Sequence, residues 1–143
     1  MNKYVFPYVK ISNKIAIELE GKTVSDAINN GIKAGVDLTF IDLSNEQLAY
    51  LDFSGCDLTG ADFSGTEMFN CEFQGANLSK TNWTDAVAKE SWFQSCIFDE
   101  ANLLFSAFVS CDVFEADFRL ARHIQTAAFS NLFDAILPEN YKR

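Results

Sequence analysis

A large apolar residue recurs at every fifth position along most of the chain. Read in fives from Val36, twenty consecutive units run to Ala135 without a break. The third residue is large and apolar in all but three units, and the first is Ala, Cys, Ser or Thr in fifteen consecutive units from Cys56 to Thr126. Chance would give such a run on the order of once in 10^8 sequences, so the chain contains a true internal repeat.

A period of five fits neither an α-helix, whose apolar face repeats every three to four residues, nor a strand that alternates every two. A coil that turns a corner every five residues accommodates it. The large third residue then fills the interior, and the small first residue lies where the backbone closes in. Asp, Asn, Ser, Thr and Gly at the remaining positions favour the turns.

The segment before the repeat has a different pattern. Residues 4–19 alternate between apolar and polar, which predicts two short strands around a turn at Ser12 and Asn13. Thr23, followed by Asp26, predicts a helix start, and the helix should run over about residues 24–34. A repeat tower exposes strand edges and an apolar cross-section at its ends, so residues 1–35 are expected to form an N-terminal cap over the β-helix of residues 36–135.

The tail of residues 136–143 is too short to cover the other end fully. The bottom coil is therefore a candidate surface for self-association.

Length and hydropathy bound the class of protein. The 143 residues suit one domain. No apolar run reaches the roughly 18–20 residues of a membrane span, and the first residues lack the apolar core of a signal peptide. We expect a cytoplasmic protein without a membrane partner.

The residue types that usually carry chemistry fall on the repeat. All four cysteines, Cys56, Cys71, Cys96 and Cys111, are first residues of a unit, and no CxxC pair is present. The single histidine, His123, falls at a third position, where a buried neutral side chain is expected. We therefore predict no catalytic residues, no metal site, no cofactor and no enzymatic activity. A pocket that holds two titratable groups with shifted pKa values would be needed to support an enzymatic function.

The units ADFSG, ANLSK, CDLTG, ANLLF and ADFRL resemble the A(D/N)LXX unit of the pentapeptide-repeat family, and the resemblance extends over residues 36–135. It implies a mainly β fold, a right-handed four-sided β-helix (a solenoid) with four units per coil. Twenty units then make about five coils, roughly 24 Å tall at the usual strand spacing, beneath a small α+β cap. A head followed by a short tower resembles small phage or bacterial members.

The repeat region is strongly acidic. The chain has a formal charge of −9, and residues 36–135 contain sixteen acidic and four basic residues. Eight acids and no base lie between Lys33 and Lys80. We predict a partner-binding acidic face on the first two coils, carried by Asp37, Asp42, Asp52, Asp57, Asp62, Glu67 and Glu72.

The net negative charge of the repeat region has two interpretations. Sixteen acidic and four basic residues on a tower roughly 24 Å tall give a charge density close to that of duplex DNA, which carries one charge per about 1.7 Å. Family members that inhibit or protect DNA gyrase resemble duplex DNA in size and charge. The resemblance thus implies a non-catalytic protein-binding module that mimics DNA. Its partner would be a nucleic-acid-binding host protein, such as gyrase, another topoisomerase or a defence factor, with no direct nucleic-acid binding.

The alternative attributes much of the acidity to architecture, because nine of the sixteen acids occupy the second position, where the repeat uses Asp or Asn for turns. In addition, gyrase-protecting members of the quinolone-resistance type are expected to have longer towers with loops inserted between the coils. The unbroken frame of this chain contains no such insertion.

With four units per coil, units 46–50, 66–70, 86–90, 106–110 and 126–130 share one side, the third side, which is predicted to be mostly apolar on its outer surface. Contiguous apolar patches usually mark a contact, and Phe69, Val87, Val109 and Phe129 are the interface candidates. Either the head or the tail folds over this side, or it forms a homodimer or binds a partner. The alternative function is therefore a structural or oligomerisation scaffold that uses the third side.

Overall fold

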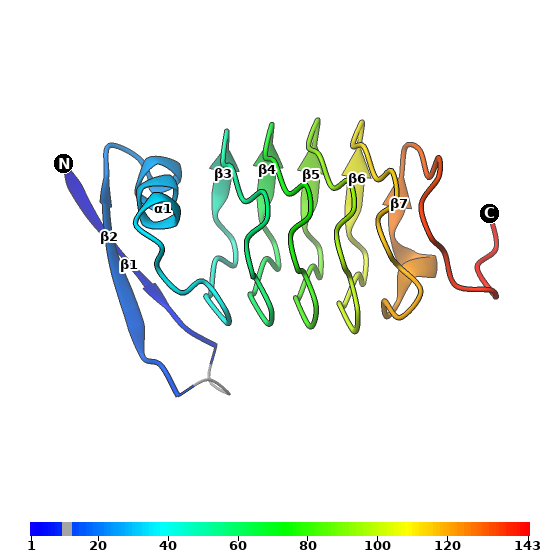
Figure 1. Ribbon diagram of the computed structural model, residues 1–143, viewed down its shortest axis with the longest axis horizontal. Helices are drawn as coiled ribbons and strands as arrows, with labels where there is room; N and C mark the ends of the chain where they lie inside the picture. The colour runs from blue at the N-terminus through cyan, green and yellow to red at the C-terminus, as the bar shows by residue number, and fades with distance from the viewer. Residues whose placement is uncertain (10–12) are drawn as a thin grey trace.

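The computed structural model describes residues 1–9 and 13–143, and its body is a stack of coils of 20 residues each (Figure 1). One side of the stack is a parallel sheet in the order β3-β4-β5-β6-β7. On the other sides, single bridges join residues 20 apart, such as Asp42 with Asp62. The five strands are Gln47–Ala49 (β3), Glu67–Phe69 (β4), Val87–Lys89 (β5), Ala107–Val109 (β6) and Ala128–Phe129 (β7).

Stacked aromatic rings fill the interior. The ring of Phe73 stacks between those of Phe53 and Phe93, with centroids 5.0 and 4.7 Å away. On the opposite side of the coil, Phe63 stacks on Trp83 at 4.7 Å. These separations equal the spacing of hydrogen-bonded strands, about 4.8 Å, so backbone pairing and ring stacking reinforce each other. The predicted interior of third-position residues is the observed core through Phe118.

Each corner has the same backbone conformation. Every fifth residue from Phe40 to Glu115 has a positive φ, and most of them are not glycine. Such a conformation costs an L-residue roughly 1–2 kcal/mol, so the corners persist only because the stacked core and ladder determine them. At residue 60 glycine leaves room for the ring of Phe40, which a Cβ there would overlap.

The head consists of an antiparallel hairpin and one helix. Strands β1 (Asn2–Pro7) and β2 (Ala16–Gly21) pair with each other, and α1 spans Val24–Lys33. Thr23 caps the helix, since its hydroxyl accepts the Asp26 N–H at 3.1 Å. Of the predicted turn, Ser12 lies outside the described residues.

The head satisfies the open edge of the first coil. Ser25 and Asn29 of α1 accept the backbone N–H groups of Ala49 and Asp52 at 3.0 and 3.1 Å. The Pro7 carbonyl accepts the Asp42 N–H at 2.8 Å. These bonds replace the partners that a preceding coil would supply.

The last coil departs from the repeat. Asn102 still pairs with Arg122, 20 residues on, but Ala107 pairs with Ala128 and Asp117 with Ile136. One residue is therefore inserted after Arg122, and residues are lost again before Ile136. The backbone therefore leaves the reading in fives over the units ARHIQ and TAAFS, which lack a large third residue.

This slip corrects two predicted placements. His123, expected in the core, is exposed at a corner with φ 62°, and Ile124, at the start of the 3-10 helix η1 (Ile124–Thr126), is buried instead. An imidazole would bring two polar nitrogens into a dry interior, whereas isoleucine brings none. Phe129, expected on the outer surface, stacks on buried Phe108 with centroids 4.9 Å apart.

The tail follows the last coil at the end opposite the head (Figure 1). Leu137 and Tyr141 are partly buried against the core. Within residues 1–9 and 13–143, no helix has the length and apolar character needed to cross a bilayer.

The ring stack makes a direct prediction about stability. Phe73→Ala removes a fully buried ring that stacks on both sides, so it should lower the free energy of unfolding by about 3–5 kcal/mol in urea denaturation. Phe105→Ala is the matched control, because the Phe105 side chain is 63% exposed. Equal losses in the two variants would contradict the stacked core.

Candidate functional site

The seven acids predicted to form a partner-binding face surround the first two coils. Asp42 is bridged to Asp62, and Asp52 to Glu72, so the members of each pair lie one above the other. These pairs belong to different sides of the coil, and Glu67 lies on the sheet side. The structure therefore brings the acids together as a belt on several sides rather than as one flat face.

The aspartates of the belt also build the corners. The Oδ1 atoms of Asp42, Asp52, Asp57 and Asp62 each accept the backbone N–H two residues on, at 2.9–3.0 Å. Asn77 makes the same bond to Ser79 at 3.0 Å. The turn thus requires one carbonyl-type oxygen and no negative charge, so the charge of these aspartates is not needed for the bond.

One acid of the belt has a basic partner in the head. Lys14 Nζ donates to Asp37 Oδ2 at 2.6 Å and to the Thr39 carbonyl oxygen at 2.9 Å. The Lys14 ammonium, helped by the Thr39 hydroxyl, lowers the pKa of Asp37 from 3.8 to about 2. The repeat gives no signal for this pair, because it depends on how the head folds back.

The four bases of the repeat all lie after the second coil, and two of them are close to acidic or carbonyl groups. Arg119 Nη2 lies 2.7 Å from Asp117 Oδ2, and the pKa of Asp117 is lowered by this guanidinium. Arg122 Nε donates to the Glu100 carbonyl oxygen at 3.3 Å. The density of uncompensated negative charge is therefore greatest in the first two coils.

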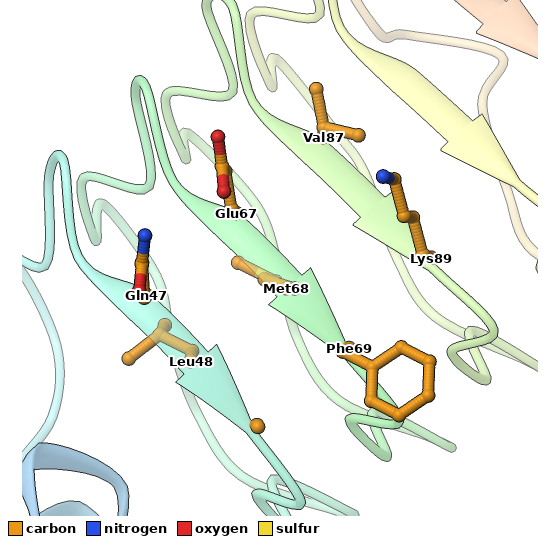
Figure 2. A pocket seen from close by; sticks show the side chains of 8 residues that line it. Gln47, Leu48, Glu67, Met68, Phe69, Val87 and Lys89 are labelled. Carbon is orange, nitrogen blue, oxygen red and sulfur yellow. The ribbon is translucent and has the colours of Figure 1, made fainter.

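The outer surface of the sheet contains an open groove of about 590 Å³ over β3, β4 and β5 (Figure 2). Small Ala49 and half-buried Val87 leave space beside the ring of Phe69, which is 39% exposed. Val109 continues this surface on β6 and is 40% exposed. Of the four apolar interface candidates, Phe69, Val87 and Val109 therefore share this outer surface, and Phe129 does not.

Tyr50 is an aromatic residue next to this groove that the sequence analysis does not predict. It is 68% exposed at a corner with φ 57°, and its ring meets that of Phe69 edge to face, with centroids 5.8 Å apart. An aromatic residue at a fifth position, where Gly, Asn and Ser are more frequent in turns, was the available signal.

The cysteines are poorly suited to reaction. Burial raises the pKa of the Cys96 thiol to about 12 and that of Cys111 to about 11. Burial also raises the pKa of Cys71 and of half-buried Cys56. Since the thiolate is the reactive form, these side chains act as small core residues. Across the described part of the chain, no three His, Cys, Asp or Glu residues gather closely enough to hold a metal ion.

Comparison with known proteins identifies the type of repeat. The family model for pentapeptide repeats matches residues 34–65, 47–85 and 66–103, with eight copies. The structure of full-length QnrB1, a plasmid-mediated fluoroquinolone resistance protein, is 28% identical over 66% of this chain and 47% of QnrB1, with a TM-score of 0.51. A trypsin-treated variant of QnrB1 is 30% identical over 68% and 49%, with a TM-score of 0.48.

A more distant structural match is a pentapeptide-repeat protein, Rfr23, from the cyanobacterium Cyanothece 51142. It is 13% identical over 68% of this chain and 64% of its own length, with a TM-score of 0.35. The chain spans about half the length of QnrB1. Among proteins with curated functions, none matches it.

The Lys14–Asp37 pair predicts a pH dependence. Because the pKa of Asp37 is lower in the folded state, its stabilising contribution is present above about pH 4 and is lost as the pH falls through 3.8 towards 2. Asp37→Asn should cost less than about 1 kcal/mol at neutral pH, since the pair is partly exposed, and only a fraction of that at pH 2, where Asp37 is about half ionised in the folded chain. Urea denaturation at both pH values measures this.

The matched control is Asp57→Asn, because Asp57 accepts the same two bonds from Thr59 one coil further on. Asparagine can accept these bonds, so this variant should stay within about 0.5 kcal/mol of the wild type at both pH values. A pH-independent loss in Asp37→Asn would count against the ion pair.

Proposed function

The chain belongs to the pentapeptide-repeat family, and we propose that it is a non-catalytic protein-binding module that directs its acidic first two coils at a DNA-binding enzyme. The observation that carries the proposal is the charge of these coils, where eight acids and no base lie between Lys33 and Lys80. The likeness to QnrB1, a fluoroquinolone resistance protein, supports DNA gyrase or a related topoisomerase as the first target to test.

The spacing of the acids supports recognition by a surface that binds nucleic acid. Bridged residues such as Asp42 and Asp62 are one strand spacing apart, about 4.8 Å. Phosphates along one DNA strand are about 3.4 Å apart along the helix axis, so the two spacings are of the same order. Rows of Lys and Arg that contact phosphates could thus contact these carboxylates.

The ion pair with Lys14 distinguishes Asp37 from the other acids that we propose for partner binding. Asp37 is already offset by an ammonium group 2.6 Å away, so it should contribute less to partner binding. Asp42, Asp52, Asp57, Asp62, Glu67 and Glu72 are the stronger candidates. Only one oxygen of each of these aspartates takes part in the turn bond described above, which supports their availability to a partner.

A binding role without catalysis is supported by the origin of the shifted carboxyl groups. The pKa values of Asp37 and Asp117 are each lowered by one neighbouring base on the surface, Lys14 and Arg119 respectively. Such shifts are those of structural ion pairs, and the raised pKa values of the thiols disfavour nucleophilic chemistry.

The charge proposal is tested by neutralising three acids of the belt. Asp42→Asn, Asp62→Asn and Glu72→Gln combined should weaken binding to purified DNA gyrase at least about tenfold at low ionic strength. The steep salt dependence of binding should flatten as well. The fold should persist, because Asn77 and Asn82 already accept the corner bond in the native chain.

The matched control changes the net charge equally in the lower coils. At about 0.15 M salt, where the Debye length is about 8 Å, Asp99→Asn, Glu100→Gln and Glu115→Gln combined should leave binding within about twofold of the wild type, because charges further away than that are screened. If both triple variants bind gyrase like the wild type, the acidic belt is not the binding surface. If both weaken it equally, only net charge matters and the first two coils have no special role.

A further inference from the structure

The outer surface of β3, β4, β5 and β6 lies uncovered between the head and the tail. Helix α1 bonds to the edge of the first coil, and the tail follows the last coil (Figure 1). Within the described residues, neither segment covers Phe69 or Val109, which remain 39% and 40% exposed. An apolar surface in this position usually contacts another molecule.

Four outward side chains at the centre of this surface form a diagonal pattern (Figure 2). Glu67 is paired with Val87, and Phe69 with Lys89, on the adjacent strands β4 and β5. The acid and the base therefore occupy opposite corners of a rectangle, and the two apolar residues occupy the other corners. Among the described residues, no ion pair shorter than 4.0 Å involves Glu67 or Lys89.

We propose that a second copy of this chain docks on this surface, with a two-fold axis along the diagonal from Phe69 to Val87. Rotation about this axis places Phe69 against the second copy's Phe69, and Val87 against its Val87. It also brings Glu67 of each copy close to Lys89 of the other. The surface is thus complementary to itself in both shape and charge.

The spacing of the sheet sets the geometry of this dimer. Strands are about 4.8 Å apart, and alternate residues on a strand about 6.7 Å apart, so a diagonal axis makes the two towers cross at roughly 70°. Small Ala49, which is paired with Phe69 on the adjacent strand, leaves room in the groove for the second copy's phenyl ring. A crossed contact buries a small area, and we expect a dissociation constant of about 10–100 µM.

Charge favours this side over the others for contact between two copies. On the neighbouring sides, carboxylates are stacked one above the other, as in Asp42–Asp62 and Asp52–Glu72. Two copies meeting there would bring like charges together. The outward residues of β3 to β6 include one acid and one base, so the sheet surface is locally neutral within a chain of charge −9.

A charge exchange tests the proposal by analytical ultracentrifugation of the full chain. Glu67→Lys and Lys89→Glu should each raise the dissociation constant of the dimer at least tenfold. The double variant, which restores both pairs across the axis, should return within about threefold of the wild type. Glu67→Lys is decisive, because it reduces the net charge of the chain and general repulsion alone would strengthen the dimer.

Control reversals are available at exposed corners with the same charge changes. Glu115→Lys and Lys80→Glu should leave the dissociation constant within about threefold. A wild type that stays monomeric near 1 mM, which is above the expected range, would overturn the proposal. A dimer unaffected by the single reversals, as contact through the bottom coil would give, or a double variant without rescue, would do so as well.

A cysteine placed near the axis provides a second measurement. Val87→Cys should form a disulfide between two copies under mild oxidation, and adding Glu67→Lys should suppress it. Asn77→Cys, on a side of the coil outside the β3–β7 sheet, is the control and should cross-link no faster than the wild type. Equal cross-linking at residues 77 and 87 would overturn the proposed axis.

Discussion

The structure depends on one constraint, the exact stacking of residues 20 apart. Parallel pairing of β3 with β4, and of β4 with β5, holds the backbone at one strand spacing, about 4.8 Å. The same spacing suits ring stacking, as between Phe73 and Phe93 at 4.7 Å. Because each coil repeats the one before it, interior, corner and outer residues form separate columns. Surface properties such as charge are then arranged along columns too.

The second residue of the unit can form the corner and also determine the surface charge. The corner at Asp62 needs an oxygen that accepts the Ser64 N–H, and Asn82 meets that need one coil later. Choosing Asp rather than Asn therefore leaves the corner bond intact and adds charge. The chain uses Asp in the first two coils and Asn at several of the same positions further on. The sheet side differs, since its outward residues make no such bond and can be apolar.

Much of the fold follows from the repeat, because the first and third residues of each five-residue unit are the ones predicted to lie inside. Phe73, Trp83 and Cys96 are buried as predicted. The errors lie in the last coil, where paired residues are 20 apart at Asn102–Arg122, 21 apart at Ala107–Ala128 and 19 apart at Asp117–Ile136, so a reading in fives does not follow the backbone. The exposure of His123 and the inward position of Phe129 follow from this slip. The Lys14–Asp37 pair was also beyond prediction, since it joins segments that no repeat relates.

We propose that the acidic first two coils occupy a DNA-binding surface of their target. Competition with duplex DNA for purified DNA gyrase is the decisive measurement. If the claim holds, bound chain and bound DNA exclude each other, and added DNA raises the apparent dissociation constant of the chain in proportion to its concentration. A stable ternary complex of gyrase, DNA and the chain, with unchanged affinity, would contradict it.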